Sequence, residues 1–119
     1  MPVPIPRIIA ASGLAALGLF QTGLAAGIPW GEASYGGAHR GTLPDRLRAT
    51  SAVAAPVYLT AAGVVGKGAA PRALLGAIAG IMGVAVIPNL ASPSPKERLW
   101  APVCAAIAVA SAMELRHTD

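Results

Sequence analysis

Charged residues are scarce in this chain, and long stretches contain none. Lys, Arg, Asp and Glu make up 12% of the 119 residues, against the ~25% that is usual in soluble domains. Four stretches carry no charge at all: residues 8–31, 49–66, 73–95 and 99–113. Because the helices of a soluble protein need a polar face toward water, this pattern argues against a soluble domain and favours an integral membrane protein.

Cysteine and histidine are also few. Cys104 is the only cysteine, so an intrachain disulfide and a thiolate metal cluster are excluded. We expect Cys104 to pack as a small buried apolar side chain. His39 and His117 lie outside the apolar stretches, and the expected topology places them on opposite membrane faces. This excludes a haem bound by both histidines. The sequence contains no phosphate-binding loop, dinucleotide fingerprint or nucleophile elbow. We therefore expect neither a metal nor a cofactor.

The net charge is +4, but the basic residues are spread over the loops. Without a basic run, nucleic acid is not an expected partner. The bilayer is the expected partner, and its anionic headgroups account for the excess of bases.

Prolines divide the chain into four apolar segments. A helix needs about 20 residues, at a rise of about 1.5 Å each, to cross a membrane. Pro6, Pro44, Pro71 and Pro95 each stand where a helix would begin, a position that tolerates the missing N–H. We predict an all-α membrane protein, a four-transmembrane-helix bundle forming one domain over residues 1–119. Its predicted helices are at about 6–28, 43–66, 71–89 and 95–115.

Local signals refine the ends of these helices. Ser94 and Glu97 match a capping box, which extends the fourth helix to a spanning length. Thr42 and Asp45 offer a similar arrangement for the second. The pairs Ile28–Pro29 and Ile87–Pro88 are expected to close the first and third helices. Kinks are expected at the two prolines inside helices, Pro56 and Pro102.

Four spans place both termini and the 66–72 turn on one membrane face, and the 29–42 and 89–100 loops on the other. Trp30 and Trp100 then lie on the loop face, as in an aromatic belt. Four bases on one face against five on the other leave the orientation open. The prolines before Arg7 and the length of the apolar run favour a retained first span over a cleaved signal peptide.

Small residues mark the expected packing surfaces. Gly23/Gly27 and Gly76/Gly80 are both GxxxG pairs, which allow helices to approach closely in lipid. We expect them to pack helices within the bundle or between copies. A homo-oligomer or a larger membrane protein is therefore an expected partner.

The candidate catalytic residues lie in the first loop. Glu32 follows Trp30 at the membrane edge, where partial desolvation favours a protonated acid. Together with His39 it could perform acid–base chemistry on a lipid-like substrate. The alternative is an interfacial carboxylate paired with Arg46 or Arg98, beside a solvated histidine. Glu97 is explained by its cap.

Five further residues are candidates for substrate binding. Two of them are polar groups inside predicted spans, where they either line a pocket or hydrogen-bond across helices. The others lie at the loop face, where belt and turn roles are the alternatives. The five are Gln21, Trp30, Tyr58, Asn89 and Trp100.

Three stretches carry a resemblance: PWGE at 29–32, GTLPDRLRATS at 41–51 and NLASPSPKERLWAPV at 89–103. In these the chain resembles an uncharacterised family of small four-span integral membrane proteins of high-GC bacteria. Seven Arg against two Lys and 27 alanines fit such a genome. The resemblance implies the topology and a bacterial cytoplasmic membrane, and it implies no activity.

Two hypotheses for function follow. The first is a non-enzymatic accessory or interaction subunit that packs through Ala/Gly-rich helices. The second is a small membrane enzyme of the cyclase, isomerase or hydrolase type, with a lipophilic small molecule bound at the 29–48 and 89–100 loop face. A passive or oligomeric channel is the third hypothesis. No charged residue lies in the middle of a span, so a proton relay or an ion-coupled transporter is poorly supported.

Overall fold

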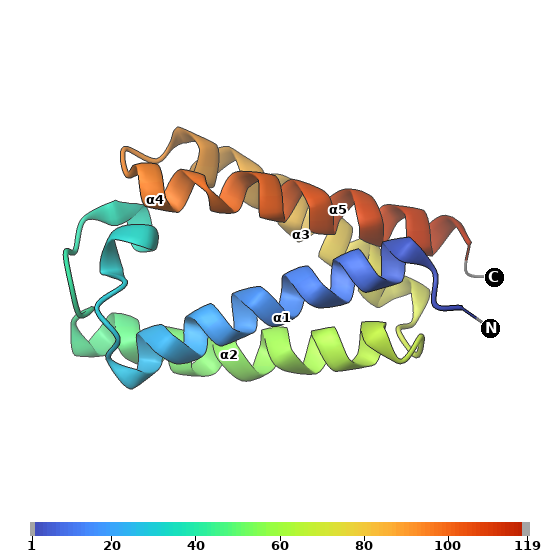
Figure 1. Cartoon of the computed structure of the whole chain (residues 1–119), viewed down its shortest axis with the longest axis horizontal. Helices are drawn as coiled ribbons and strands as arrows, with labels where there is room; N and C mark the ends of the chain where they lie inside the picture. The colour runs from blue at the N-terminus through green and yellow to red at the C-terminus, as the bar shows by residue number, and fades with distance from the viewer. Residues whose placement is uncertain (1, 118–119) are drawn as a thin grey trace.

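Four long helices form the body of the molecule in the computed structural model, which describes residues 2–117 (Figure 1). A single-turn helix precedes the last long one, and two short 3₁₀ helices lie in the first loop. In chain order the elements are α1 (Ile5–Ala26), η1 (Gly31–Ala33), η2 (Tyr35–Gly37), α2 (Asp45–Gly66), α3 (Arg72–Ala91), α4 (Pro95–Arg98) and α5 (Trp100–Arg116). With α4 and α5 taken together, four helices are long and apolar enough to cross a membrane. The predicted all-α architecture with four candidate spans is confirmed.

The helices pack so that α1 contacts both α2 and α5, and α3 contacts α5. The start of α1, the α2–α3 turn and the end of α5 lie at one end of the bundle (Figure 1). An ion pair between Arg7 Nε and Glu114 Oε2, 2.8 Å apart, joins α1 to α5 there. The α1–α2 loop and the α3–α4 turn lie at the other end, here called the loop end. The predicted placement of both termini concerns residues 1, 118 and 119, which are outside the described residues.

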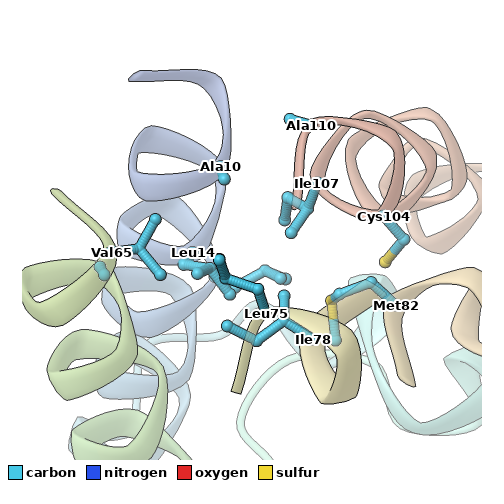
Figure 2. Close-up of a cluster of buried hydrophobic side chains, with 11 residues drawn as sticks. Ala10, Leu14, Val65, Leu75, Ile78, Met82, Cys104, Ile107 and Ala110 are labelled. Carbon is cyan, nitrogen blue, oxygen red and sulfur yellow. The ribbon is translucent and has the colours of Figure 1, made fainter. Parts of the chain in front are cut away.

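The core lies where the four long helices meet (Figure 2). Leu14 of α1, Val65 of α2, Leu75 of α3 and Ile107 of α5 are each almost fully buried. Apolar side chains also cover the outside of the bundle. Among those exposed are Val53, Val57, Ile81, Val84 and Ile87. Helices that are apolar all round are typical of a membrane environment.

Two helix ends differ from the prediction. α1 ends at Ala26, before Ile28–Pro29, because Gly27 adopts a left-handed conformation with φ 94° and turns the chain out of the helix. α3 was predicted to close at Ile87–Pro88, which is wrong: it continues through Pro88 to Ala91. The Asn89 side chain donates a hydrogen bond of 2.7 Å to the Ala85 carbonyl, which reinforces the turn that contains the proline.

The two predicted caps have different outcomes. Ser94 caps α4, because its Oγ accepts a hydrogen bond from the Glu97 N–H at 3.5 Å. The Thr42/Asp45 cap is wrong: Pro44 is the N-cap of α2 and makes no side-chain bond. Thr42 Oγ1 instead donates to the Gly27 carbonyl at 3.0 Å, so it closes the first loop.

The internal prolines also act differently from one another. α2 runs through Pro56 without interruption. The fourth span is interrupted at Leu99, between α4 and α5, three residues before Pro102. A proline ring clashes with the carbonyl four residues earlier, here that of Arg98, so the break lies on the N-terminal side of Pro102.

The closest contacts of glycines with another long helix are not at the predicted GxxxG pairs. A side chain at Gly13 would collide with Ile107 of α5, and one at Gly18 with Leu59 of α2. Gly23 lies against the ring of Trp30 in its own loop. A methyl group at Gly80 would meet nothing within 4 Å. Of the second GxxxG pair, Gly80 therefore faces away from the bundle, whereas Gly76 lies next to Leu115 of α5.

Candidate functional site

The α1–α2 loop folds back over the loop end of the bundle because two glycines allow close approach. The Gly31 N–H donates to the Gly41 carbonyl at 2.8 Å, and a side chain at Gly31 would collide with the carbonyl oxygens of His39 and Gly41. Gly37 has a φ of 71° and lies against the Ser94 side chain. These positions admit only glycine without strain.

Tyr35 is held in an unusual backbone conformation within this loop. Its φ is 48°, in the left-handed region that non-glycine residues rarely adopt. The Tyr35 hydroxyl lies 3.0 Å from Ser51 Oγ of α2, at hydrogen-bond distance. Such strain persists only where the surroundings hold the residue in place, and it clusters at functional sites.

The same loop is fastened to α4 on its other side. Glu97 Oε2 accepts a hydrogen bond from the Gly36 N–H at 3.2 Å, and the Ser94 hydroxyl donates to the Glu32 carbonyl oxygen. Lys96 Nζ lies 3.3 Å from the Glu32 carboxylate. The loop therefore bridges the start of α2 and α4.

Beneath the loop lies a cavity of about 160 Å³, here called the loop-end cavity. Its wall comes from the loop and from all four spanning segments. The lining residues are Leu17, Phe20, Gln21, Ala33, Ser34, Tyr35, Tyr58, Met82, Ala85, Asn89, Glu97, Trp100 and Cys104. No basic side chain is among them.

Four of the five predicted substrate-binding residues line this cavity. They are Gln21, Tyr58, Asn89 and Trp100, which come from four different spanning segments. Within residues 2–117, Gln21 Oε1 is buried and has no hydrogen-bond partner. The Asn89 amide nitrogen is bonded to the Ala85 carbonyl, which leaves its oxygen for a donor. Gln21 and Asn89 thus place amide groups in the wall of the cavity.

The fifth, Trp30, lines an apolar groove beside the cavity. The groove has a volume of about 440 Å³, and Phe20 and Trp100 belong to both linings. Phe20 stacks on Trp30 with ring centroids 5.8 Å apart, and its centroid lies 4.8 Å from that of Trp100. Phe20 and Trp100 therefore form the wall between cavity and groove. The other residues that line the groove are Ala33, Lys96, Leu99 and Val103.

The two predicted catalytic residues lie outside both spaces. The Glu32 side chain is 39% exposed and pairs with Lys96, not with Arg46 or Arg98. His39 lines neither the cavity nor the groove, and its carbonyl oxygen packs against Gly31. The structure does not bring Glu32 and His39 to the residues predicted to bind a substrate.

The carboxylate that does line the cavity is Glu97, which sequence reasoning had assigned to the helix cap alone. Only its backbone N–H serves the cap; its side chain faces the cavity and Gly36. Phe20, Tyr35 and Cys104 were also missed. A usable signal was present, because the chain has only five aromatic residues and all five line the cavity or the groove.

No family model, curated protein or solved structure matches this chain. Its function is therefore inferred from the chemistry of its own side chains. No group of three or more His, Cys, Asp or Glu within residues 2–117 is arranged to hold a metal ion.

Proposed function

We propose that this chain is an integral protein of the bacterial cytoplasmic membrane that serves as a non-enzymatic accessory or interaction subunit. Four helices apolar enough to span a bilayer support the membrane location. The Arg-rich, Ala-rich composition supports a high-GC bacterial source. The Arg7–Glu114 pair, which joins the start of α1 to the end of α5, supports termini on one membrane face.

The observation that carries this proposal is the open space at Gly80 of α3, on the helix face that also carries Gly76 and Gly83. Methyl groups at Gly76 and Gly83 would lie 3.9 Å from Leu115 and Ala108 of α5, at ordinary contact distance, whereas one at Gly80 would find nothing within 4 Å. Lipid gives helices no hydrophobic reason to associate, so small residues that permit close approach drive packing. This surface fits a helix of a second copy or of a larger membrane protein.

A pair of glycine variants tests the proposal. Gly80→Leu should abolish an oligomer, or the cross-linking to a partner in native membranes, because its side chain fills the surface where a second helix would lie. Gly63→Leu on α2 is the matched control, since Gly63 also has open space around it. Assembly that is unchanged by Gly80→Leu, or equally lost in both variants, would contradict the proposal.

A second candidate function, a small membrane enzyme acting on a lipophilic substrate, is favoured by the loop-end cavity. An acid–base residue must lie within hydrogen-bond reach of its substrate. Glu97 meets that condition for a molecule in the cavity, whereas Glu32 faces Lys96 outside it. A reaction of the cyclase, isomerase or hydrolase type would then use Glu97 as the proton donor or acceptor.

The enzyme is tested by comparing two carboxylate variants in the native host. Loss of a general acid or base costs roughly 10²–10⁴ in rate, so Glu97→Gln should abolish a product or phenotype at normal protein levels. Glu32→Gln should be tolerated, because an exposed ion pair contributes only about 0–1 kcal/mol. Full function in Glu97→Gln would exclude this chemistry.

A further inference from the structure

The loop-end cavity contains a carboxylate without a cationic partner. Glu97 is 9% exposed, and Gly36 N–H is a hydrogen-bond donor to its side chain. The ion pairs found within residues 2–117 are Arg7–Glu114 and Lys96–Glu32, so Glu97 takes part in neither. Buried charges in proteins are paired. A positive charge next to Glu97 would therefore be favoured.

Two residues that line the same cavity, Gln21 and Asn89, carry neutral amide oxygens. Gln21 Oε1 is buried without a partner in the described chain, and the Asn89 amide is oriented with its nitrogen on the Ala85 carbonyl. A buried acceptor without a hydrogen-bond partner lowers the stability of the folded state. A ligand that brings hydrogen-bond donors or positive charge would remove that cost.

Four aromatic residues, Phe20, Tyr35, Tyr58 and Trp100, line the same cavity. All five aromatic residues of the chain line the cavity or the adjoining groove. The face of an aromatic ring attracts an organic cation, and rings grouped around a space recognise ammonium groups. A carboxylate, the unpartnered Gln21 oxygen and aromatic side chains together favour an ammonium over an anion or a plain hydrocarbon.

The two volumes indicate the shape of the ligand. A cavity of about 160 Å³ is close to one of about 150 Å³ that holds benzene, so it suits a small head. The groove of about 440 Å³ has an apolar wall that includes Leu99 and Val103, and it suits a hydrocarbon part. Phe20 and Trp100, which line both, would lie beside the junction.

We propose that the loop-end cavity binds the ammonium head of a lipophilic amine, whose apolar part lies in the groove. The site holds whether the chain is an accessory subunit or an enzyme, because it needs neither a partner nor a reaction. The amine is either a free amphiphile or a membrane lipid with an ammonium headgroup, and both present the same chemistry to Glu97.

The first experiment measures binding to the purified wild-type chain in a neutral maltoside detergent. Benzyltrimethylammonium should change the fluorescence of Trp30 and Trp100 saturably. Benzenesulfonate, of similar size and opposite charge, should bind at least about tenfold more weakly. The absence of saturable ammonium binding, or equal affinity for the two probes, would overturn the proposal.

Two carboxylate variants locate the binding. Glu97→Gln keeps a hydrogen-bond acceptor for Gly36 but removes the charge, so affinity for the ammonium should fall at least about tenfold. Glu32→Gln should leave it unchanged. If Glu97→Gln does not melt cooperatively, Phe20→Leu decides, since losing one ring from both linings should weaken binding about threefold or more. Unchanged affinity in the folded variant would overturn the proposal.

Lipid composition then separates the two sources of the amine. Binding of benzyltrimethylammonium is compared between nanodiscs that contain phosphatidylethanolamine and nanodiscs of phosphatidylglycerol alone. If the natural ligand is a lipid, phosphatidylethanolamine competes for the site and the apparent affinity for benzyltrimethylammonium is lower in the first. Equal binding in both assigns the site to a free amine. These measurements involve no partner protein, so they succeed or fail independently of the α3 glycine variants.

Discussion

Arg7, near the start of α1, forms an ion pair with Glu114, near the end of α5, at a distance of 2.8 Å. The two side chains are 27% and 7% exposed, so the pair lies mostly inside the protein. It joins the first and last spanning helices at the end of the bundle opposite the loop-end cavity. Their separation of 107 positions in the chain places this contact beyond the reach of any local sequence pattern.

Glu114→Gln should lower the free energy of unfolding by about 1–3 kcal/mol, because it leaves Arg7 without its counter-charge. This range lies between exposed pairs at about 0–1 kcal/mol and fully buried pairs at about 3–5 kcal/mol. Reversible unfolding in mixed detergent micelles measures the change. Glu32→Gln, which breaks the exposed pair with Lys96, is the control and should stay within about 0.5 kcal/mol. Equal effects of the two variants would contradict this account.

Two glycines of the predicted GxxxG pairs should respond oppositely to alanine. Gly23→Ala should destabilise by about 1–3 kcal/mol, because the new methyl group collides with the Trp30 ring. Gly76→Ala should be neutral or stabilise by up to about 1 kcal/mol, because Leu115 is 3.9 Å from the added methyl and alanine is the better helix former. Thermal unfolding in detergent compares them. A loss of stability in Gly76→Ala as large as in Gly23→Ala would contradict the difference in packing between the two glycines.

The two ends of the bundle should be reached from opposite sides of the membrane. Ala38 and Pro93 are exposed at the loop end, and Lys67 is exposed at the other. Single cysteines at these positions, in a Cys104→Ser background, should react with an impermeant maleimide in two groups on intact vesicles. Labelling of positions 38 and 93 from different sides would disprove the four-span topology.

Gln21→Met should stabilise the unliganded protein by about 1 kcal/mol. The change removes a buried oxygen that lacks a partner and conserves volume. The melting temperature in detergent should therefore rise. Asn89→Leu, from the same cavity lining, should instead lose about 0.5–1.5 kcal/mol with the bond to Ala85. A destabilised Gln21→Met would mean that the Gln21 oxygen is satisfied after all.

Features that depend on neighbouring residues could be predicted from the sequence alone. The four spans follow from uncharged stretches of about 20 residues, since lipid demands apolar side chains all round a helix. The Ser94 cap could be predicted because the cap and the residue that bonds to it, Glu97, are only three positions apart. Predictions from proline were less secure. The sequence alone predicts that the third helix ends at Pro88. In the structure α3 continues through Pro88, because the Asn89 side chain reinforces the helical turn that contains the proline.

The candidate site was predicted in part, and the tertiary structure decided its chemistry. Gln21 and Tyr58 were expected as polar groups inside spans and Asn89 as a residue of the loop face, and all three line the loop-end cavity. The acid was chosen by position, at the membrane edge, which selected Glu32. The fold instead turns Glu32 outward to Lys96 and Glu97 inward beside Gly36, 61 residues away in the chain. Membrane crossing is determined by hydropathy along one helix, whereas the facing of a carboxylate depends on contacts between helices and loops distant in sequence.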